Sequence, residues 1–340
     1  MEQTLKAVIY GATGYTGIEL IRALLNHPYI EISELVSSSS AGKKVGEVLP
    51  FLSPYYLSEK YLVSEPQEDF DLAFLCLPHE VSYELVPQLL KKGKKVVDLS
   101  GAYRIKDSSL YAEFYGFEHK NERELKEAVY GLPEVFREDI KRATLVANPG
   151  CYPTATLLAI YPFLKAGLEI SDVIIHALSG VSGAGRKTKQ HFHFPEMTEN
   201  FFAYSVEKHR HTPEIEDVIK RISGREVKIR FTPTVIPASR GMVSTVYLRS
   251  EKTNVRDLFL ETYGGEIFVR VCDTPPHTKW VIGTNNCFIY PFYDERTERY
   301  VIISVIDNLG KGASLQAIQN ANIMLGIEED AGLLQTPFFP

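Results

Sequence analysis

Hydrophobic and polar positions in the first 150 residues follow two alternating patterns. Apolar positions at helical spacing predict helices at residues 14–25 and 81–90. Short continuous apolar runs predict buried strands at residues 5–10, 30–36, 72–77 and 95–99. Buried strands separated by helices are typical of a parallel sheet covered on both faces, so we predict a doubly wound α/β domain here.

The second half of the chain has longer strand patterns with fewer helices between them. The strands are predicted at residues 173–178, 227–235, 242–248, 267–271, 287–293 and 300–306. This arrangement predicts an α+β domain built on a mixed or largely antiparallel sheet. Near the C-terminus, apolar residues at helical spacing predict a last helix at residues 312–325.

Composition narrows the class of protein. A chain of 340 residues with 44% hydrophobic and 24% charged residues suits about two globular domains. Its net charge of −6 argues against a nucleic-acid binder held by bulk electrostatics. The first residues lack the long apolar segment of a signal peptide, so we expect none, and no apolar stretch approaches a membrane span. The four cysteines form no CxxC pair, so we expect no metal site, no disulfide framework and a cytoplasmic protein.

The first predicted strand ends in a glycine-rich turn, "YGATGYTGIEL". Its GxxGxxG spacing differs from the usual GxGxxG, but the physical logic is the same: a tight turn, close approach of backbone to a pyrophosphate, and a helix N-terminus facing the anion. A plain glycine-rich turn is the alternative. We predict a Rossmann-like dinucleotide site that includes Gly11, Thr13, Gly14, Tyr15, Thr16 and Gly17.

The end of the second strand bears on the choice of dinucleotide. An NAD site usually carries an acidic residue about 20 residues beyond the glycines. Here the sequence reads "LVSSSSAGKK", which has hydroxyls and cations but no acid. Ser37, Ser38 and Lys43 therefore favour the 2′-phosphate of NADP(H), although a solvated polar loop is a competing interpretation for each of them.

Later strand ends supply further candidates, because open α/β sheets bind ligands at the carboxyl ends of their strands. Pro78 follows the third strand and is predicted to lie near the cofactor. Ser100 and Arg104 follow the fourth strand, and a guanidinium there would suit phosphate or carboxylate. A surface ion pair is the alternative for Arg104.

One cysteine stands where a strand gives way to a helix, in "LVANPGCYPTAT". The strand ends near Asn148, and the helical pattern begins at Pro153. Cys151 would then lie beside unpaired N–H groups at the positive end of a helix dipole, which lowers a thiol's pKa. The alternative is a small buried hydrophobic residue.

Two further stretches interrupt the second half. The glycine-rich loop "SGVSGAGRKTK" could present N–H groups of Ser182 and Gly183 to an anion or a nicotinamide. His209 and His211 precede a predicted helix that His211 or Thr212 would open. A histidine is the usual partner of a cysteine nucleophile, and no third metal ligand is obvious.

Together these motifs resemble a known family. "GATGYTG", "ANPGCYPTA", "SGVSGAGRK", "KHRHTPEI", "TPTVIPASRGM" and "DNLGKGASLQAIQNANIMLG" are similar to N-acetyl-gamma-glutamyl-phosphate reductase, within the wider aspartate-semialdehyde dehydrogenase superfamily. Two motifs depart from the family pattern: "LSGAYR" stands for "LSADFR", and "LGKGA" for "LVKGA".

The resemblance implies an NADPH-dependent acyl-phosphate reductase of arginine biosynthesis that works through a cysteine thioester. It implies a nucleophile, Cys151, an acid/base, His211, and a homodimer or homotetramer. It also implies a cofactor domain at 1–149 and 312–340 and a catalytic domain at 150–311. We expect Asn308 near the nicotinamide. The expected substrate ligands are Ser100, Arg104 for the phosphate, Asn148, His209 and Arg240 for the α-carboxylate.

Three alternatives stay open at this point. A related reductase could act on a carrier-bound aminoadipyl phosphate of lysine synthesis. The YxxxK patterns at 204–208 and 56–60 match short-chain dehydrogenases, but neither lies at a convincing helix position. A non-catalytic NADP-binding protein would need no reactive thiol.

Overall fold

The computed structural model describes residues 4–186 and 189–339, and the chain divides into two compact units. The first unit comprises Met1–Arg104, Asn121–Asn148 and Ser314–Leu333. The second comprises Ile105–Lys120, Pro149–Ala313 and Leu334–Pro340. Residues 105–120 and 334–340 thus group with the second unit, whereas the sequence analysis assigned them to the first domain.

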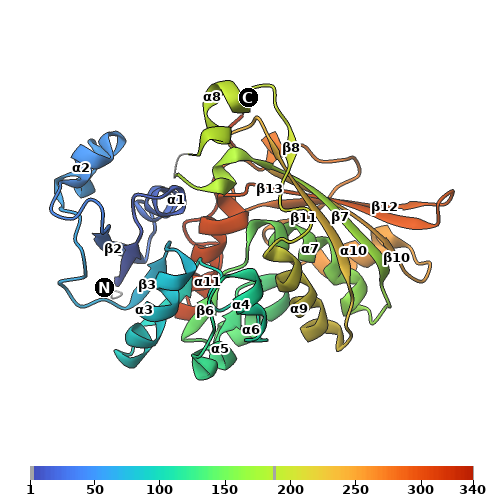
Figure 1. Cartoon of the computed structure of the whole chain (residues 1–340), viewed down its shortest axis with the longest axis horizontal. Helices are drawn as coiled ribbons and strands as arrows, with labels where there is room; N and C mark the ends of the chain where they lie inside the picture. The colour runs from blue at the N-terminus through green and yellow to red at the C-terminus, as the bar shows by residue number, and fades with distance from the viewer. Residues whose placement is uncertain (1–3, 187–188, 340) are drawn as a thin grey trace. The chain divides into compact units, whose positions relative to one another are not determined.

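The first unit is built on a six-stranded sheet in which every pair of neighbouring strands is parallel (Figure 1). In the order β2-β1-β3-β4-β6-β5, the strands are β2 (Ile30–Val36), β1 (Leu5–Tyr10), β3 (Leu72–Leu75), β4 (Lys95–Asp98), β6 (Leu145–Ala147) and β5 (Val129–Tyr130). The order reverses between β1 and β3, and such a switch point is where doubly wound sheets bind ligands. The predicted Rossmann-like fold is confirmed.

Helices flank this sheet because their apolar faces must be buried. They are α1 (Tyr15–Leu24), α3 (His79–Lys91), α5 (Glu122–Glu127), α6 (Pro133–Ile140) and α11 (Leu315–Leu325). The short helix α2 (Val45–Val48) packs instead against two 3-10 turns at residues 50–52 and 56–59. Helix α11 packs against α1, α6 and β4, while α3 contacts β4. The strands themselves are almost entirely apolar and buried, as their continuous hydrophobic runs predicted.

The second unit is built on a seven-stranded mixed sheet, which confirms the second predicted fold. In the order β11-β12-β13-β10-β7-β9-β8, the strands are β11 (Val269–Val271), β12 (Cys287–Asp294), β13 (Arg299–Ile306), β10 (Met242–Arg249), β7 (Ser171–Gly180), β9 (Ile229–Ile236) and β8 (Phe202–Ala203). The pairs β7–β9 and β11–β12 are parallel, and the others are antiparallel.

Three helices, α7, α9 and α10, pack on this sheet (Figure 1). The helices of the unit are α4 (Leu110–Phe114), α7 (Cys151–Lys165), α8 (Phe194–Met197), α9 (His211–Ser223) and α10 (Val255–Tyr263). Helix α7 is apolar nearly all round because it lies between the sheet and the other two helices. Its first residue is therefore fixed by a buried helix.

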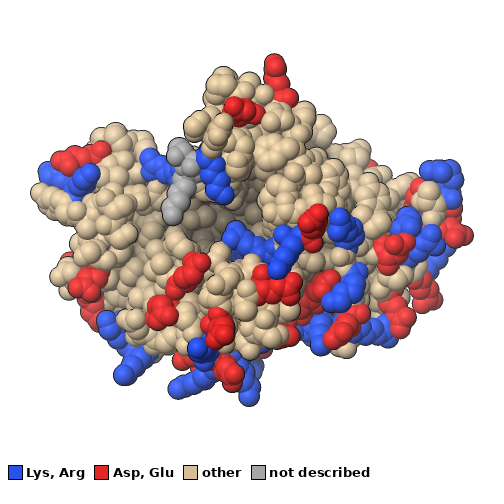
Figure 2. Space-filling view, in the orientation of Figure 1, with Lys and Arg blue, Asp and Glu red and all other residues tan. Residues whose placement is uncertain are grey.

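The surface carries charges of both signs. On the face drawn in Figure 2, acidic and basic side chains alternate without a broad basic field of the kind that binds nucleic acid. Among the described residues, no helix is long and apolar enough to cross a membrane. In the same part of the chain, no group of three or more His, Cys, Asp or Glu side chains is placed to hold a metal ion.

Candidate active site

The turn between β1 and α1 needs glycine for two separate reasons. Gly11 has a φ of +75°, and a Cβ there would lie 2.2 Å from the carbonyl oxygen of Cys76. A Cβ on Gly17 would lie 2.5 Å from the carbonyl oxygen of Gly11, so the helix approaches the strand closely. Gly14 is the N-cap of α1, and because it has no side chain, no cap covers the N–H groups at the helix start. A bare helix N-terminus of this kind suits a phosphate group.

Two other predicted cofactor residues lie next to this turn. The hydroxyls of Thr13 and Ser37 are 3.3 Å apart, which ties the turn to the end of β2. The carbonyl of Thr16 accepts a hydrogen bond from the hydroxyl of Ser314, at 2.9 Å, within the same unit. Of the remaining candidates, Ser37 is buried, and Tyr15, Ser38, Lys43 and Pro78 are exposed.

The ends of β4 and β6 bring together three predicted substrate residues. The Ser100 hydroxyl donates to Asp98 (2.8 Å) and accepts from the backbone N–H of Ala102 (3.1 Å). Arg104 donates from Nε to the Asn148 carbonyl (2.7 Å) and from Nη2 to the Leu99 carbonyl (2.8 Å). Burial raises the pKa of the Asp98 carboxyl, and Arg104 acts in the opposite direction. Arg104 is thus an almost fully buried cation held on two carbonyl oxygens.

Asn148 is held just as firmly. Its side-chain oxygen accepts from Asn320 of α11 (3.0 Å), and Asn320 also donates to the carbonyl of Gly131 (2.8 Å). Its backbone N–H donates to the carbonyl of Asp98 (2.8 Å). Asn148 is fully buried, so it shapes the strand ends around Arg104.

Cys151 is the first residue of α7, two residues earlier than the predicted helix start. Gly150 is the N-cap, and its N–H donates to the fully buried carboxylate of Glu214 (2.9 Å), in the first turn of α9. Thr154 bonds back to the carbonyl of Gly150 (3.0 Å). The Cys151 side chain therefore projects from a helix start at which the N-cap residue is hydrogen-bonded through both its N–H and its carbonyl.

The two predicted histidines lie around the ring of Tyr152, the residue after the thiol. The ring of Tyr152 is edge-on to His209 at 5.9 Å and to His211 at 5.8 Å between centroids. His211 opens α9, and its backbone N–H donates to Nδ1 of His209 (3.1 Å). Burial, reinforced by the neighbouring Arg210, lowers the pKa of His209 to about 4. A neutral His209 can accept this bond, so it orients the start of α9.

Two tyrosine hydroxyls complete the surroundings of the thiol. The hydroxyls of Tyr204 and Tyr152 are 3.3 Å apart. Burial raises the pKa of both phenols, that of Tyr204 to about 12, and a negative charge on Cys151 adds to both shifts. The hydroxyls therefore stay protonated at neutral pH. Tyr204 is the first residue of the YSVEK match, yet it lies among these aromatic rings rather than on a helix.

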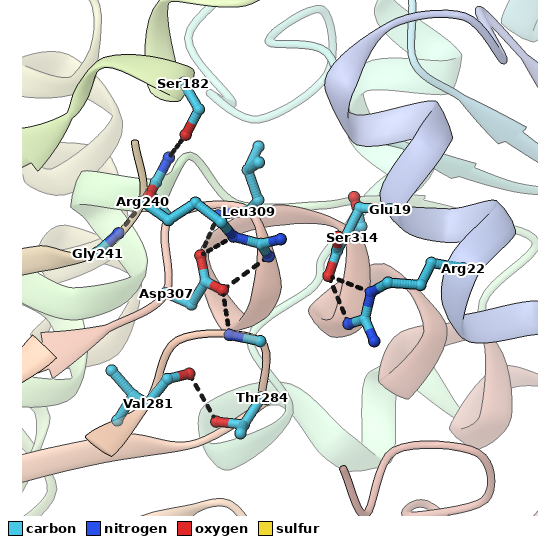
Figure 3. A network of polar contacts seen from close by, with 12 residues as sticks. Glu19, Arg22, Ser182, Arg240, Gly241, Val281, Thr284, Asp307, Leu309 and Ser314 are labelled. Carbon is cyan, nitrogen blue, oxygen red and sulfur yellow. Dashed lines mark hydrogen bonds and ion pairs between the residues drawn. The ribbon is translucent and has the colours of Figure 1, made fainter. Parts of the chain in front are cut away.

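A polar network holds the end of β13 and the loops beside it (Figure 3). Asp307 is fully buried and forms a two-pronged ion pair with Arg240, Nε to Oδ1 at 3.2 Å and Nη2 to Oδ2 at 2.7 Å. Its carboxylate also accepts the N–H groups of Gly283 (2.6 Å) and Leu309 (3.0 Å). Arg240 is thus bound to a carboxylate of its own chain.

The neighbouring residue, Asn308, bridges two loops. Its side-chain oxygen accepts from the N–H of Gly241 (2.9 Å), and its amide nitrogen donates to the hydroxyl of Ser182 (2.9 Å). The predicted nicotinamide residues Ser182, Gly183 and Asn308 therefore lie together. Residues 187 and 188 of the predicted glycine-rich loop lie outside the described residues.

Several of these residues have no role in the sequence analysis. Glu214 and Asp307 stand inside the quoted motifs "HRHTPEI" and "DNLGKGA", where a single acid in an apolar context is the only signal. Tyr152 was part of the cysteine motif without a role. The hydrogen bonds that give Glu214 and Asp307 their roles join residues that are 64 and 67 positions apart in the sequence.

Comparison with known proteins first gives the class. The family model of the semialdehyde dehydrogenase NAD binding domain matches residues 6–143, and that of the semialdehyde dehydrogenase dimerisation domain matches residues 151–308. The fold resembles aspartate semialdehyde dehydrogenase II from Vibrio cholerae, complexed with ASA, with a TM-score of 0.74 and 17% identity over 96% of this chain and 99% of that chain. It also resembles aspartate semialdehyde dehydrogenase with NADP from Candida albicans (TM-score 0.72, 19% identity, 95% of this chain and 99% of that chain). The protein has the semialdehyde dehydrogenase fold.

Closer relatives define the family within that class. The chain is 72% identical to N-acetyl-gamma-glutamyl-phosphate reductase of Aquifex aeolicus (strain VF5) over the whole of both chains. It is 46% identical to the enzyme of that name from Pelotomaculum thermopropionicum, over 98% of this chain and 99% of the relative. The chain belongs to the N-acetyl-gamma-glutamyl-phosphate reductase family.

Proposed function

We propose that this chain reduces N-acetyl-γ-glutamyl phosphate to N-acetylglutamate semialdehyde with NADPH and releases phosphate. The observation that carries the proposal is Cys151 at the start of α7, with His211 at the start of α9 on the same aromatic ring. The names of the matched relatives supply the acyl group. Relatives at 43–72% identity carry this name, and nothing favours the aminoadipyl alternative.

The chemistry assigned to the second unit is thioester formation. The Cys151 thiolate attacks the acyl carbon, the C–O bond to phosphate breaks, and a thioester forms. His211 takes the thiol proton before the attack, and returns a proton to the sulfur as the C–S bond breaks and the aldehyde C=O forms. The N–H groups at the start of α7 face the acyl oxygen and stabilise its developing negative charge.

The cofactor proposal rests on the fit of the β1–α1 turn to a dinucleotide. Gly11 and Gly17 pack where any Cβ would collide, and Gly14 leaves the α1 N-terminus bare for a pyrophosphate. The loop after β2 offers Ser38 and Lys43, exposed and without a nearby acid in sequence, to a 2′-phosphate. When bound, NADPH supplies the hydride that reduces the thioester.

The anion assigned to Arg104 is the phosphate. The carbonyls of Asn148 and Leu99 orient this guanidinium, and its planar fork matches the oxygens of a phosphate. Arg240 is not included as a ligand of the α-carboxylate, because Nε and Nη2 already bind Asp307. Its role in this proposal is to fix the loop before β10.

We also propose that a second copy of the chain covers the outer face of the seven-stranded sheet. Ile174, Tyr247, Val301 and Phe292 face one another in a cross-strand row on β7, β10, β13 and β12. Three of them are exposed despite being apolar, which is typical of an interface. The matched dimerisation domain contains all these strands. A sedimenting mass of one chain would contradict this arrangement.

The reverse reaction tests the function without the labile acyl phosphate. N-acetylglutamate semialdehyde, inorganic phosphate and NADP are mixed with the wild-type protein, with Cys151→Ser and with Cys272→Ser, and NADPH absorbance is followed. We expect phosphate-dependent NADPH formation by the wild type and Cys272→Ser, and none by Cys151→Ser. Replacing NADP with NAD should slow the reaction if Ser38 and Lys43 bind the 2′-phosphate.

Thiol labelling separates an enzyme from a non-catalytic binding protein. Burial raises the pKa of Cys76 to about 12, it raises that of Cys272 as well, and Cys287 is fully buried. Iodoacetamide should therefore select Cys151, and acyl substrate should block the labelling. Labelling without selection, together with no turnover, would exclude the proposed reductase.

A further inference from the structure

The turn that follows β13 approaches the nucleophile more closely than any side chain would allow. A Cβ built on Gly312 would lie 2.9 Å from Cβ of Cys151 and 3.3 Å from its Cα. The φ of Gly312 is not in the left-handed region, so its backbone is open to any residue. Space beside Cys151 is therefore what requires glycine at this position.

The turn cannot easily move away from the thiol, because it is held on the side that precedes Gly312. The N–H of Gly312 donates to the carbonyl of Asp307 (2.9 Å), and the Asp307 carboxylate is fixed by Arg240, Gly283 and Leu309. Gly310 lies so close to Thr284 that a Cβ there would be 2.3 Å from the Thr284 carbonyl oxygen.

The residue between these glycines adds to the rigidity. Lys311 is fully buried, and its Nζ lies 5.8 Å from the centre of the Phe268 ring. A buried ammonium group is costly to move, because every new position must again satisfy its charge. Residues 310–314 also form a single π-helical turn, a feature that often marks functional sites.

Cys151 is equally constrained on its own side. Its helix is buried, and the peptide before it is bound to Glu214 and Thr154. An added Cβ at residue 312 would thus be accommodated by a shift of the Cys151 backbone, because Cβ of Cys151 does not move when the side chain rotates, and the sulfur would shift with it. The turn therefore determines where the sulfur can lie.

We propose that Gly312 is a positioning residue for Cys151: its bare Cα, held by the Asp307 network, sets the rotamer and place of the thiol. This proposal rests on the proposed function, in which the thiol is the nucleophile. Gly312 acts through Cys151 and does not itself react.

Gly312→Ala tests the proposal, with Gly265→Ala as the matched control, because a Cβ at Gly265 meets nothing within 4 Å. In the reverse reaction we expect kcat of Gly312→Ala to fall about 100-fold, as a displacement near 1 Å can cost. KM for NADP should stay within about two-fold of wild type, since the thiol is not a cofactor ligand. The rate of Cys151 alkylation by iodoacetamide, measured against pH, should also change.

Gly265→Ala should match the wild type in all three measurements. Wild-type kcat and an unchanged alkylation profile in folded Gly312→Ala would overturn the proposal. If Gly312→Ala does not fold, Asp307→Asn takes its place, because it loosens the turn while leaving Gly312 bare; unchanged alkylation there would overturn it equally. Alkylation needs no substrate, so it tests Gly312 even if the wild type fails the reverse assay, which would count against the proposed function alone.

Discussion

Arg104 in the first unit and Arg240 in the second lie beside strand ends, and the chain holds them in opposite ways. Arg104 donates to two backbone carbonyls. Arg240 donates both Nε and Nη2 to the buried carboxylate of Asp307. A carbonyl orients a guanidinium and leaves its charge in place, whereas a carboxylate cancels that charge.

The difference teaches how to separate binding arginines from structural ones. In sequence both arginines followed or preceded a strand near glycine, and both suited an anion. From these hydrogen bonds we propose Arg104 as the anion ligand and Arg240 as a brace for the loop that Asn308 also holds. Variants of the two arginines should therefore fail in different assays.

Apart from loss of the thiol, the largest expected effect is that of replacing His211. This residue is assigned to proton transfer, whereas the two arginines are assigned to anion binding and to holding a loop. His211→Gln should lower kcat by about 100- to 10,000-fold, the usual contribution of a positioned acid/base. Binding of NADP, measured by fluorescence titration, should be unchanged. His193→Gln, at an exposed position outside the sheet, is the control and should keep full activity. Near-normal turnover of His211→Gln would transfer the proton step to another group.

Next in size are the two arginine variants, which address the comparison directly. Arg104→Gln should raise KM for phosphate in the reverse reaction by about 10- to 100-fold, through loss of a charged hydrogen bond. Arg240→Gln should instead lower the free energy of unfolding by about 3 kcal/mol, because it leaves the buried Asp307 unpaired. Urea unfolding and phosphate titration of both variants measure the contrast. A rise in phosphate KM for Arg240→Gln alone would reverse the two roles.

Features encoded within a few residues could be predicted from the sequence. The buried strands, the glycine turn after β1, a cysteine at a helix start and a helix opened by His211 or Thr212 all follow from local patterns. The start of α7 was missed by two residues, because Pro153 fits the first turn but does not mark its beginning. Strands β5 and β8, two residues each, are too short to show any period.

The partners of the polar residues could not be predicted. Nothing in the sequence near Arg240 points to Asp307, and nothing near Gly150 points to Glu214, since the fold alone brings these pairs together. The same holds for Gly312, whose need for glycine comes from Cys151. Local patterns thus indicated which residues take part, and tertiary contacts decided what each can do.

The smallest effect concerns His209, which like Arg240 supports its neighbours by a fixed hydrogen bond. Burial and the neighbouring Arg210 lower its pKa from the usual 6.5 to about 4. The unfolded chain therefore gains a proton as the pH falls through 6.5, while the folded protein does not until about pH 4. Stability from this residue is complete above pH 6.5 and falls by up to about 3 kcal/mol toward pH 4.

His209→Gln should remove that part of the acid destabilisation. Urea unfolding at pH 7.5 and pH 5 should show a smaller difference for the variant than for the wild type. The variant should also be less stable at pH 7.5, because Nδ1 no longer accepts the N–H of His211. An equal loss of stability on acidification in both proteins would mean that His209 is protonated in the fold, and the bond that orients α9 would then need another acceptor.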